Sequence, residues 1–386
     1  MIRDHLSHGG NTRLIAAASG FPESRILDFS ANINPFGPPA WLSEAIEEGM
    51  SRIAFYPDPE ATKARNAASL KFSTPAERFL FADGADSLLF ALPGALKADA
   101  CVLPVPTYSG CRRAIRHAGI REIALPLLSE EGFSMDSSRF VASLRETLEG
   151  RGRASGGQAG SAGRRQGDAK AKRMIVFLGA PNNPAGGMLP FSLIEDMAGE
   201  FSSHVFVIDE SFLELTLSGQ SLIGTEIANI VVARSLTKAW AVPGARVGFI
   251  YAHPEICAAV RADIPAWPVS SFAEAIAKRA LGDADFLGRT VPALMAEEAV
   301  FSMALSELRG FKVFRSGANF LLLDAGDDAR GALIAESLLR TGIAVRRFSP
   351  GEGLSDRYIR LAVRSRGENR RFIEALKTIL ESERPR

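Results

Sequence analysis

Seven short apolar runs, separated by stretches of helical periodicity, constrain the fold of this 386-residue chain more than any other feature. Each run is rich in β-branched or aromatic residues and is bounded by Gly, Pro or a charged residue, as buried strands are. Strands that alternate with helices predict an α/β fold with a large, mainly parallel seven-stranded sheet and helices on both faces. The expected strands are Phe79–Ala82, Cys101–Pro104, Glu122–Leu125, Met174–Leu178, Val205–Asp209, Ile230–Ser235 and Val247–Tyr251.

From about Trp267 onward, long helical patterns and short strands predict a second, smaller α/β domain over residues 267–386. Residues 46–266 are the expected large domain. Residues 1–45 are too few for a domain and are expected to form an arm that packs on the small domain or on another subunit. The expected small-domain elements are helices over Ser271–Ala280, Pro292–Leu308 and Ala329–Thr341, strands over Lys312–Arg315, Asn319–Asp324, Ala344–Phe348 and Tyr358–Val363, and a final helix to Ser382.

Composition disfavours several other classes of protein. A net charge of +1, from 45 Lys and Arg against 44 Asp and Glu, argues against electrostatic binding of nucleic acid. Neither a membrane span nor the apolar core of a secretory signal is apparent, so we expect a cytoplasmic protein without a membrane partner. Three widely spaced cysteines suggest neither disulfides nor a metal site, and are expected to be packed thiols. Residues 149–172, rich in Gly, Ser, Ala and Arg, predict a flexible surface insertion.

Lys238 lies in the sequence Ser235-Leu236-Thr237-Lys238, at the end of an expected strand, and Arg246 follows eight residues later. A lysine placed where sheet ends meet a cleft can form a Schiff base with an aldehyde cofactor. Ser235 and Arg246 are suited to donate hydrogen bonds to a phosphate beside it. As a bare pattern this is weak, and a surface lysine is the simpler interpretation.

Four further strand ends carry polar or aromatic groups. Gly84-Ala85-Asp86 opens a helix, whose free N–H groups and dipole favour a phosphate. Asp209 puts a carboxylate at the end of a buried strand, where a protonated pyridine nitrogen is a suitable partner. The rigid turn Pro181–Pro184 can present an amide to a ring oxygen, and Tyr108 offers an aromatic face for stacking.

Taken in order, these segments resemble the fold-type I pyridoxal-phosphate enzymes, in the branch of the histidinol-phosphate aminotransferases. The resemblance extends from about residue 8 to 380 and implies an aspartate aminotransferase-like fold with pyridoxal 5'-phosphate as cofactor. It implies three catalytic residues: Lys238 bound to the cofactor aldehyde, Asp209 on the pyridinium nitrogen and Tyr108 stacked on the ring. Asn183 would meet the ring oxygen. The implied ligands of the cofactor phosphate are Gly84, Ala85, Asp86, Ser235 and Arg246.

Two further aromatic positions bear on this resemblance, one that matches the family pattern and one that departs from it. Tyr56, in Phe55-Tyr56-Pro57, resembles the tyrosine that reaches the cofactor phosphate of the neighbouring subunit, which implies an obligate homodimer with shared active sites. Phe212 departs from the family pattern, because aminotransferases of this branch usually have a tyrosine there. Phenylalanine cannot donate a hydrogen bond to the ring oxygen, so proton transfer near the cofactor is expected to differ from that in a transaminase.

The resemblance also implies a substrate site. Arg346 and Arg360 stand at positions that hold the substrate carboxylate in related enzymes, and arginine suits bidentate capture of a carboxylate. Without the family, surface ion pairs would be the preferred interpretation. The arm that includes His8 and Asn32 resembles threonine-phosphate decarboxylases of the cobalamin pathway, as do residues 353–358 and 362–365. By this resemblance His8 and Asn32 bind the substrate phosphate, and Asn183 completes the substrate site.

The leading hypothesis is a pyridoxal-phosphate enzyme that decarboxylates L-threonine O-3-phosphate to (R)-1-aminopropan-2-yl phosphate in cobalamin biosynthesis. The alternatives are an aminotransferase for histidinol phosphate or a related phospho-amine, and a decarboxylase of O-phosphoserine. No single residue decides between the two reactions. A pyridoxal-binding transcription regulator would need a helix-turn-helix domain before the fold, yet the cofactor motifs begin by residue 84. An enzymatically silent interaction protein is disfavoured, because the cofactor set is intact.

Overall fold

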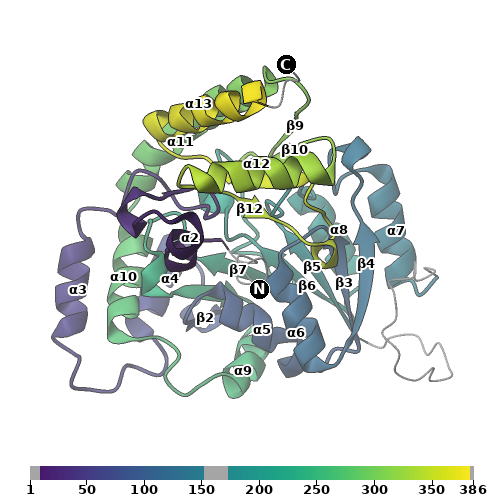
Figure 1. Cartoon of the computed structure of the whole chain (residues 1–386). Coiled ribbons are helices and arrows are strands. Elements are labelled where there is room, and N and C mark those ends of the chain that lie inside the picture. The colour runs from purple at the N-terminus through teal and green to yellow at the C-terminus, as the bar shows by residue number, and fades with distance from the viewer. Residues whose placement is uncertain (1–8, 152–172, 383–386) are drawn as a thin grey trace.

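The chain folds around one large, seven-stranded sheet (Figure 1). The computed structural model describes residues 9–151 and 173–382, so His8 and residues 152–172 of the predicted insertion lie outside the described residues. The strand order is β2-β8-β7-β6-β5-β3-β4. β8 is antiparallel to both of its neighbours and the other pairs are parallel, which confirms the predicted mainly parallel sheet. The bounds are β2 Phe79–Ala82, β3 Ala100–Val105, β4 Arg121–Pro126, β5 Met174–Gly179, β6 Val205–Asp209, β7 Ile230–Ser235 and β8 Gly248–Tyr251.

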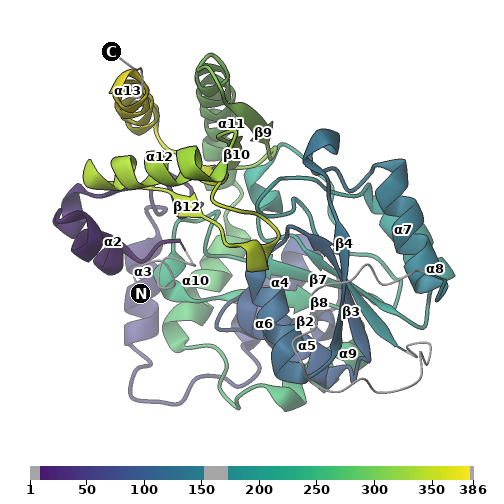
Figure 2. The same ribbon diagram turned by 45° about the vertical axis from the view of Figure 1, so that its right-hand side comes forward.

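Helices cover both faces of this sheet because its strands are apolar on both sides. In β6, for example, Val205 and Val207 belong to one buried cluster, and Phe206 and Ile208 to the other. Helices α5, α6 and α9 contribute side chains to the cluster that contains Val205 and Val207. Helices α4, α7, α8 and α10 contribute side chains to the cluster that contains Phe206 and Ile208 (Figure 2). Their bounds are α4 Thr62–Phe72, α5 Ala85–Ala95, α6 Ser109–Ala118, α7 Ser138–Leu148, α8 Phe191–Glu200, α9 Pro254–Asp263 and α10 Ser271–Gly282.

A second sheet lies toward the C-terminus, in the antiparallel order β12-β13-β10-β9. Its strands are β9 Lys312–Arg315, β10 Phe320–Asp324, β12 Arg346–Arg347 and β13 Tyr358–Ala362, with helices α11 Asp285–Ser306, α12 Asp328–Arg340 and α13 Arg366–Ser382 beside it. The predicted start of a helix at Pro292 is wrong. The Asp283 carboxylate accepts the N–H groups of Asp285 and Phe286 and so starts α11 seven residues earlier, with Pro292 inside it.

The N-terminal segment crosses from this second sheet to the large one. It contains α2 (Thr12–Ser19), β1 (Leu27–Asp28) and α3 (Leu42–Met50). β1 pairs in parallel with β11 (Ile343–Ala344), so the strand predicted over Ala344–Phe348 is instead two short strands, β11 and β12, in different sheets. Further along, the Asn34 N–H donates to the Lys238 carbonyl (3.0 Å). The segment therefore joins the second sheet to the turn that carries Lys238.

The carboxyl ends of the parallel strands lie at one edge of the large sheet, where ligands bind in open α/β sheets. β3, β5, β6 and β7 end there, and so does β2, which runs in the same direction. Cys101, Cys111 and Cys257 are buried and free. Within the described ranges, no helix combines the length and the apolar character that a bilayer span requires.

Candidate active site

A cavity of about 690 Å³ opens at this edge, between the large sheet, the N-terminal segment and the second sheet. Tyr56 does not line it, and His8 lies outside the described residues. All the other residues that the sequence assigns to the cofactor or the substrate line this cavity: Asn32, Gly84, Ala85, Asp86, Tyr108, Asn183, Asp209, Ser235, Lys238, Arg246, Arg346 and Arg360.

One end of the cavity is built to hold an anion. Gly84 precedes α5 with φ +112 and supplies no side-chain cap, so the first N–H groups of α5 remain available. A Cβ on Gly84 would lie 2.9 Å from Nη2 of Arg246, so the absence of a side chain lets the guanidinium approach the helix start. Ser235 and Thr237, whose hydroxyls lie 2.8 Å apart, complete this set of donors. Thr237 is a member that the sequence interpretation did not include.

Lys238 lies next to this anion site, directly after β7. Burial lowers the pKa of its amine, the Asp209 carboxylate opposes that shift, and the Arg360 and Arg246 guanidiniums add to it. A lowered pKa keeps more of the amine neutral and therefore nucleophilic. The Phe212 ring centroid lies 4.5 Å from Nζ, so this departure from the family pattern places an apolar ring against the reactive amine.

Tyr108 is fixed from two sides at the start of α6. Its hydroxyl donates to Oδ1 of Asp86 (2.9 Å), and Arg113 donates to the other oxygen of that carboxylate (3.3 Å). Burial and the Asp86 charge raise the pKa of Tyr108 well above its ordinary value, so the hydroxyl stays neutral. A Cβ on Gly110 would lie 2.3 Å from the Tyr108 ring, so Gly110 makes room for this ring orientation.

Asp209 ends β6 and Glu210 follows it, and the two side chains project to opposite sides, as successive residues of extended chain do. Asp209 lines the cavity, and its Oδ1 accepts the Ser211 N–H (3.0 Å). Glu210 is buried on the other side, where its carboxylate accepts Nε of Arg234 from β7 (2.9 Å) and the Leu222 N–H (2.9 Å). This buried ion pair ties together the ends of the two strands that carry Asp209 and Lys238.

Two buried arginines from the second sheet also line the cavity. Arg346 and Arg360 face each other directly in the antiparallel pairing of β12 with β13 and are 6% and 7% exposed. Arg360 donates to Oδ1 of Asn183 (2.6 Å) and to the Ser30 carbonyl (2.6 Å). Burial and the neighbouring Arg346 charge lower the pKa of Arg360, because two like charges share a poorly solvated site. An anionic ligand would relieve that repulsion.

Asn32 lies in the wall of the same cavity. It is 5% exposed, and neither its amide nitrogen nor its amide oxygen has a hydrogen-bond partner. Buried polar atoms in native proteins are nearly always paired, so an unpaired amide in a cavity wall indicates a ligand contact. Nearby, Gly10 donates its N–H to the Ser30 hydroxyl (3.0 Å) and so brings the start of α2 to the cavity.

The donors fit pyridoxal phosphate, the cofactor that the resemblance implies. The α5 start, Ser235, Thr237 and Arg246 would hold its phosphate, where the missing Gly84 side chain leaves room. Lys238 would bind its aldehyde carbon, and Asp209 would pair with the ring nitrogen. Tyr108 and Asn183 line the same cavity beside them.

Three residues that shape the site were given no role of their own in the sequence interpretation, although two of them lie within motifs that it singled out. Thr107 donates to the Asn182 Oδ1 (2.7 Å), and the Asn182 amide donates to the Pro106 carbonyl (2.9 Å), which joins the turns after β3 and β5. Glu352 lines the cavity beside Arg346. The sequence signal for Thr107 and Asn182 is that each is a polar residue shortly after a strand. The sequence around Glu352 offers no such signal.

Comparison with known proteins places these features in a family. Residues 24–376 match the family model described as aminotransferase class I and II. The adenosylcobalamin biosynthesis bifunctional protein CobDQ of Leptospira interrogans is 33% identical over 380 residues, which cover 98% of this chain but only 42% of that protein. Threonine-phosphate decarboxylase of Salmonella typhimurium is 27% identical, with 97% and 96% of the two chains covered. Histidinol-phosphate aminotransferase of Methanopyrus kandleri is also 27% identical, over 97% and 93%.

Solved structures agree on the fold. Histidinol-phosphate aminotransferase from Sinorhizobium meliloti, in complex with pyridoxal-5'-phosphate, superposes with a TM-score of 0.78 at 22% identity, over 97% of this chain and 95% of that one. L-threonine-O-3-phosphate decarboxylase from Porphyromonas gingivalis gives a TM-score of 0.75 at 22% identity, over 92% and 100%. The aspartate aminotransferase-like fold expected from the sequence is thus confirmed.

Proposed function

This chain belongs to the aminotransferase class I and II family, with pyridoxal phosphate as its cofactor, and we propose that it decarboxylates L-threonine O-3-phosphate to (R)-1-aminopropan-2-yl phosphate in cobalamin biosynthesis. A role related to cobalamin is supported by the bifunctional relative from Leptospira and by the decarboxylase from Salmonella.

The observation that carries the proposal is the arrangement of anion-binding groups away from the cofactor phosphate site. Arg346 and Arg360 form one pair of cationic groups, and Asn32 offers a separate, unpaired amide. An amino-acid phosphate carries two anionic groups, a carboxylate and a phosphate, and can use both. Histidinol phosphate carries only the phosphate, so it would leave either the arginine pair or the unpaired Asn32 amide without a ligand group.

When bound, the cofactor ring accepts the electron pair left on the α-carbon as a bond to it breaks. The chain's own residues then have distinct tasks. Arg360, held by Asn183 and the Ser30 carbonyl, binds and orients the carboxylate that leaves as carbon dioxide. Asp209 keeps a proton on the ring nitrogen. Lys238, whose amine has a lowered pKa, is the group suited to move a proton at the α-carbon.

The runner-up reaction is amino transfer from histidinol phosphate or a related phospho-amine, and decarboxylation of O-phosphoserine is a close variant. The similarity to the Methanopyrus aminotransferase favours the runner-up, whereas Phe212 disfavours it. Both reactions are measured by incubating the loaded enzyme separately with O-phospho-L-threonine and with histidinol phosphate, and following carbon dioxide release beside glutamate formation from 2-oxoglutarate. Carbon dioxide without glutamate supports the proposal, and glutamate without carbon dioxide contradicts it.

Asn32→Ala is expected to weaken use of O-phospho-L-threonine roughly ten- to hundredfold, because hydrogen bonds to a charged group are worth about 1.5–3 kcal/mol. Stability should hardly change, since the Asn32 amide has no partner to lose. Asn34→Ala is the matched control. Its amide donates to the Ala239 carbonyl and the Thr290 hydroxyl, so this variant should lower the unfolding free energy by about 1–3 kcal/mol. His8→Ala is expected to resemble Asn32→Ala, and wild-type turnover in both variants would argue against the phosphate site.

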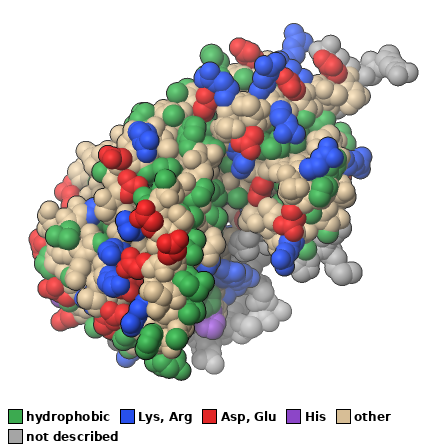
Figure 3. Space-filling view, turned by 90° about the vertical axis from the view of Figure 1, so that its left-hand side faces the viewer, with side chains coloured by type: hydrophobic (Ala, Val, Ile, Leu, Met, Phe, Trp, Pro, Cys, Tyr) green, Lys and Arg blue, Asp and Glu red, His purple; other side chains and the backbone are tan. Residues whose placement is uncertain are grey.

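We also propose a homodimer in which Tyr56 completes the partner's active site. Tyr56 is 77% exposed and stacks on Trp267, itself 49% exposed, with ring centroids 4.3 Å apart. Other large apolar side chains are exposed nearby in sequence: Met50, Ile53 and Phe55. Charged side chains of both signs lie side by side on the face of the molecule that Figure 3 shows. Exposed large apolar side chains of this kind suit an interface.

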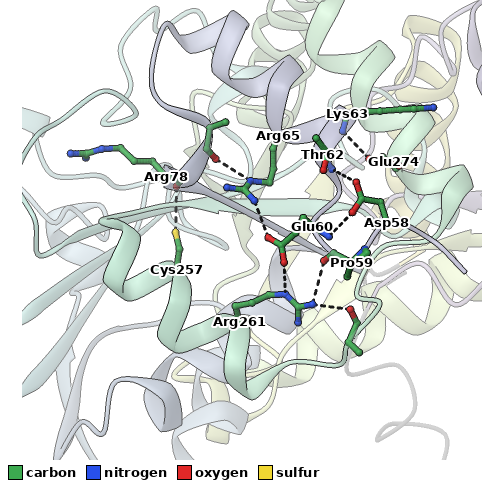
Figure 4. Close-up of polar contacts among 12 residues, drawn as sticks. Asp58, Pro59, Glu60, Thr62, Lys63, Arg65, Arg78, Cys257, Arg261 and Glu274 are labelled. Carbon is green, nitrogen blue, oxygen red and sulfur yellow. Dashed lines mark hydrogen bonds and ion pairs between the residues drawn. The ribbon is translucent and has the colours of Figure 1, made fainter.

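Polar contacts anchor the segment after Tyr56 (Figure 4), although the tyrosine itself is exposed. Asp58 accepts the N–H groups of Glu60 and Thr62 at the start of α4, and Arg261 donates to the Pro59 carbonyl (3.3 Å). Glu60 pairs with Arg65 (2.9 Å). Tyr56 is therefore presented on a preorganised segment, which lowers the entropic cost of its contact with a partner.

A mixing experiment tests the shared site. Inactive Tyr56→Ala and Lys238→Ala chains, unfolded and refolded together, should recover activity, because one site of each mixed dimer has both an intact Lys238 and an intact Tyr56. Random pairing gives about a quarter of wild-type activity. If the mixture stays inactive, or if an active monomer persists on dilution in sedimentation, the shared site is wrong.

A further inference from the structure

Glu352 places a carboxylate in the substrate cavity, against one of the two buried arginines. It ends η6 (Pro350–Glu352), which lies between β12 and β13, and its side chain is 15% exposed. One carboxylate oxygen pairs with Nη2 of Arg346. The other accepts the N–H (3.1 Å) and the hydroxyl (3.2 Å) of Ser349. All three partners come from the same short stretch of chain, so the carboxylate and Arg346 form a local unit.

The turn that carries Glu352 is seated on the large sheet rather than free in solvent. Arg112 from α6 donates to the Gly351 carbonyl and is itself paired with Glu122 of β4 (2.9 Å). Gly353 packs so closely that a Cβ there would lie 2.2 Å from a methyl group of Val105. The Glu352 carboxylate therefore holds its place in the cavity wall through contacts that do not involve a ligand.

The negative charge of Glu352 affects how the two arginines bind an anionic ligand. Arg346 and Arg360 face each other across β12 and β13, and Glu352 is an anion beside Arg346 that also acts on Arg360. Resting on the function proposed above, the substrate brings a carboxylate and a phosphate into the same cavity. An anion that approaches Arg346 finds the guanidinium charge already neutralised by Glu352. The Glu352 carboxylate also repels the anion, because both are negatively charged.

We propose that Glu352 is the resident counter-anion of Arg346, in competition with the anionic group of the substrate, and that it thereby sets the affinity of the cavity for anionic ligands. With no ligand, the Glu352 carboxylate offsets the buried Arg346 charge. The same carboxylate repels an anionic ligand. Only a ligand that makes enough other contacts in the cavity therefore binds beside the Glu352 carboxylate or displaces it from Arg346. The cavity thus excludes small anions that lack those contacts.

An alternative role for Glu352 predicts the opposite effect on ligand affinity. If Glu352 only oriented Arg346 for the substrate, removing its charge would loosen the guanidinium and weaken binding. Under the proposal, removing its charge removes the anion that competes for Arg346 and strengthens binding. Glu352→Gln separates the two roles, because glutamine retains the length of the side chain and an oxygen that can accept from Arg346 and Ser349.

The test measures binding of 3-phosphonooxybutanoate, the substrate skeleton without its amine, to the cofactor-loaded protein by titration calorimetry. Glu352→Gln should bind this probe about three- to thirtyfold more tightly than wild type. Its melting temperature without the probe should fall, because a counter-anion is lost, and the rise on adding the probe should exceed that of wild type. Glu336→Gln is the matched control. It removes the same charge next to Arg347, which does not line the cavity, and should leave affinity unchanged.

Tighter binding in Glu352→Gln alone supports the proposal. Unchanged or weaker binding in that variant overturns it, and equal tightening in Glu336→Gln overturns it as well, because the effect would then be one of net charge. The probe cannot react, so this comparison needs no turnover. Failure of the proposed function would show separately, as the absence of carbon dioxide release by the wild-type enzyme.

Discussion

Lys238→Ala is expected to abolish covalent attachment of the cofactor and to reduce turnover by at least about a thousandfold. The lysine supplies both the bond to the cofactor aldehyde and the proton transfer at the α-carbon, and proton transfer by a placed side chain alone contributes 10²–10⁴-fold. In wild type, borohydride should bleach the visible band of the bound cofactor and leave a pyridoxyl group on the peptide that contains Lys238. The variant should show neither effect.

The matched control for this experiment is Lys278→Ala. Lys278 lies on α10, half exposed and paired at the surface with Glu48 (3.4 Å), so its loss should cost little stability and no activity. The phosphate site of the Lys238 variant is intact, so it should still bind the cofactor reversibly. A pyridoxyl group found on any other lysine would show that the catalytic lysine is misassigned.

The strand segments and the residues at their ends could be predicted from the sequence because both are local. β6 is apolar up to Asp209 and β7 is apolar up to Arg234 and Ser235, so the change to polar residues marks the point where each strand leaves the core. Parallel strands end at one edge, so these residues meet without any knowledge of distant contacts. The cofactor end of the cavity therefore follows from pattern and resemblance together.

The substrate end could be predicted only in part, because its contacts join segments far apart in the chain. Arg360 contacts Asn183 and the Ser30 carbonyl, 177 and 330 residues away. The split of the predicted strand at Ala344–Phe348 has a similar origin. Its first part, β11, pairs with the N-terminal strand β1, whereas its second part, β12, pairs with β13. Glu352 escaped notice since it lies in a polar turn without periodicity, and only its contact with Arg346 gives it meaning.

Arg360→Ala is expected to lower kcat/KM for O-phospho-L-threonine by about 30- to 5,000-fold. Truncating one partner of a buried, hydrogen-bonded charge pair costs about 2–5 kcal/mol, and each 1.36 kcal/mol is one decade in rate. kcat should fall as well as the affinity, because Arg360 orients the carboxylate whose bond must break. Cofactor binding should persist, since the phosphate donors and Lys238 come from other elements.

A loss of that size must be separated from simple damage to the fold. Arg360 joins the turn after β5 to the N-terminal segment, so its removal should also lower the unfolding free energy, by about 1–3 kcal/mol. Arg360→Lys retains the charge but not the two-pronged geometry, and should recover stability more fully than activity. Arg366→Ala, an exposed arginine paired with Glu297, should change neither. If Arg360→Ala kept wild-type carbon dioxide release, the carboxylate would bind elsewhere, while the Lys238 assignment would stand.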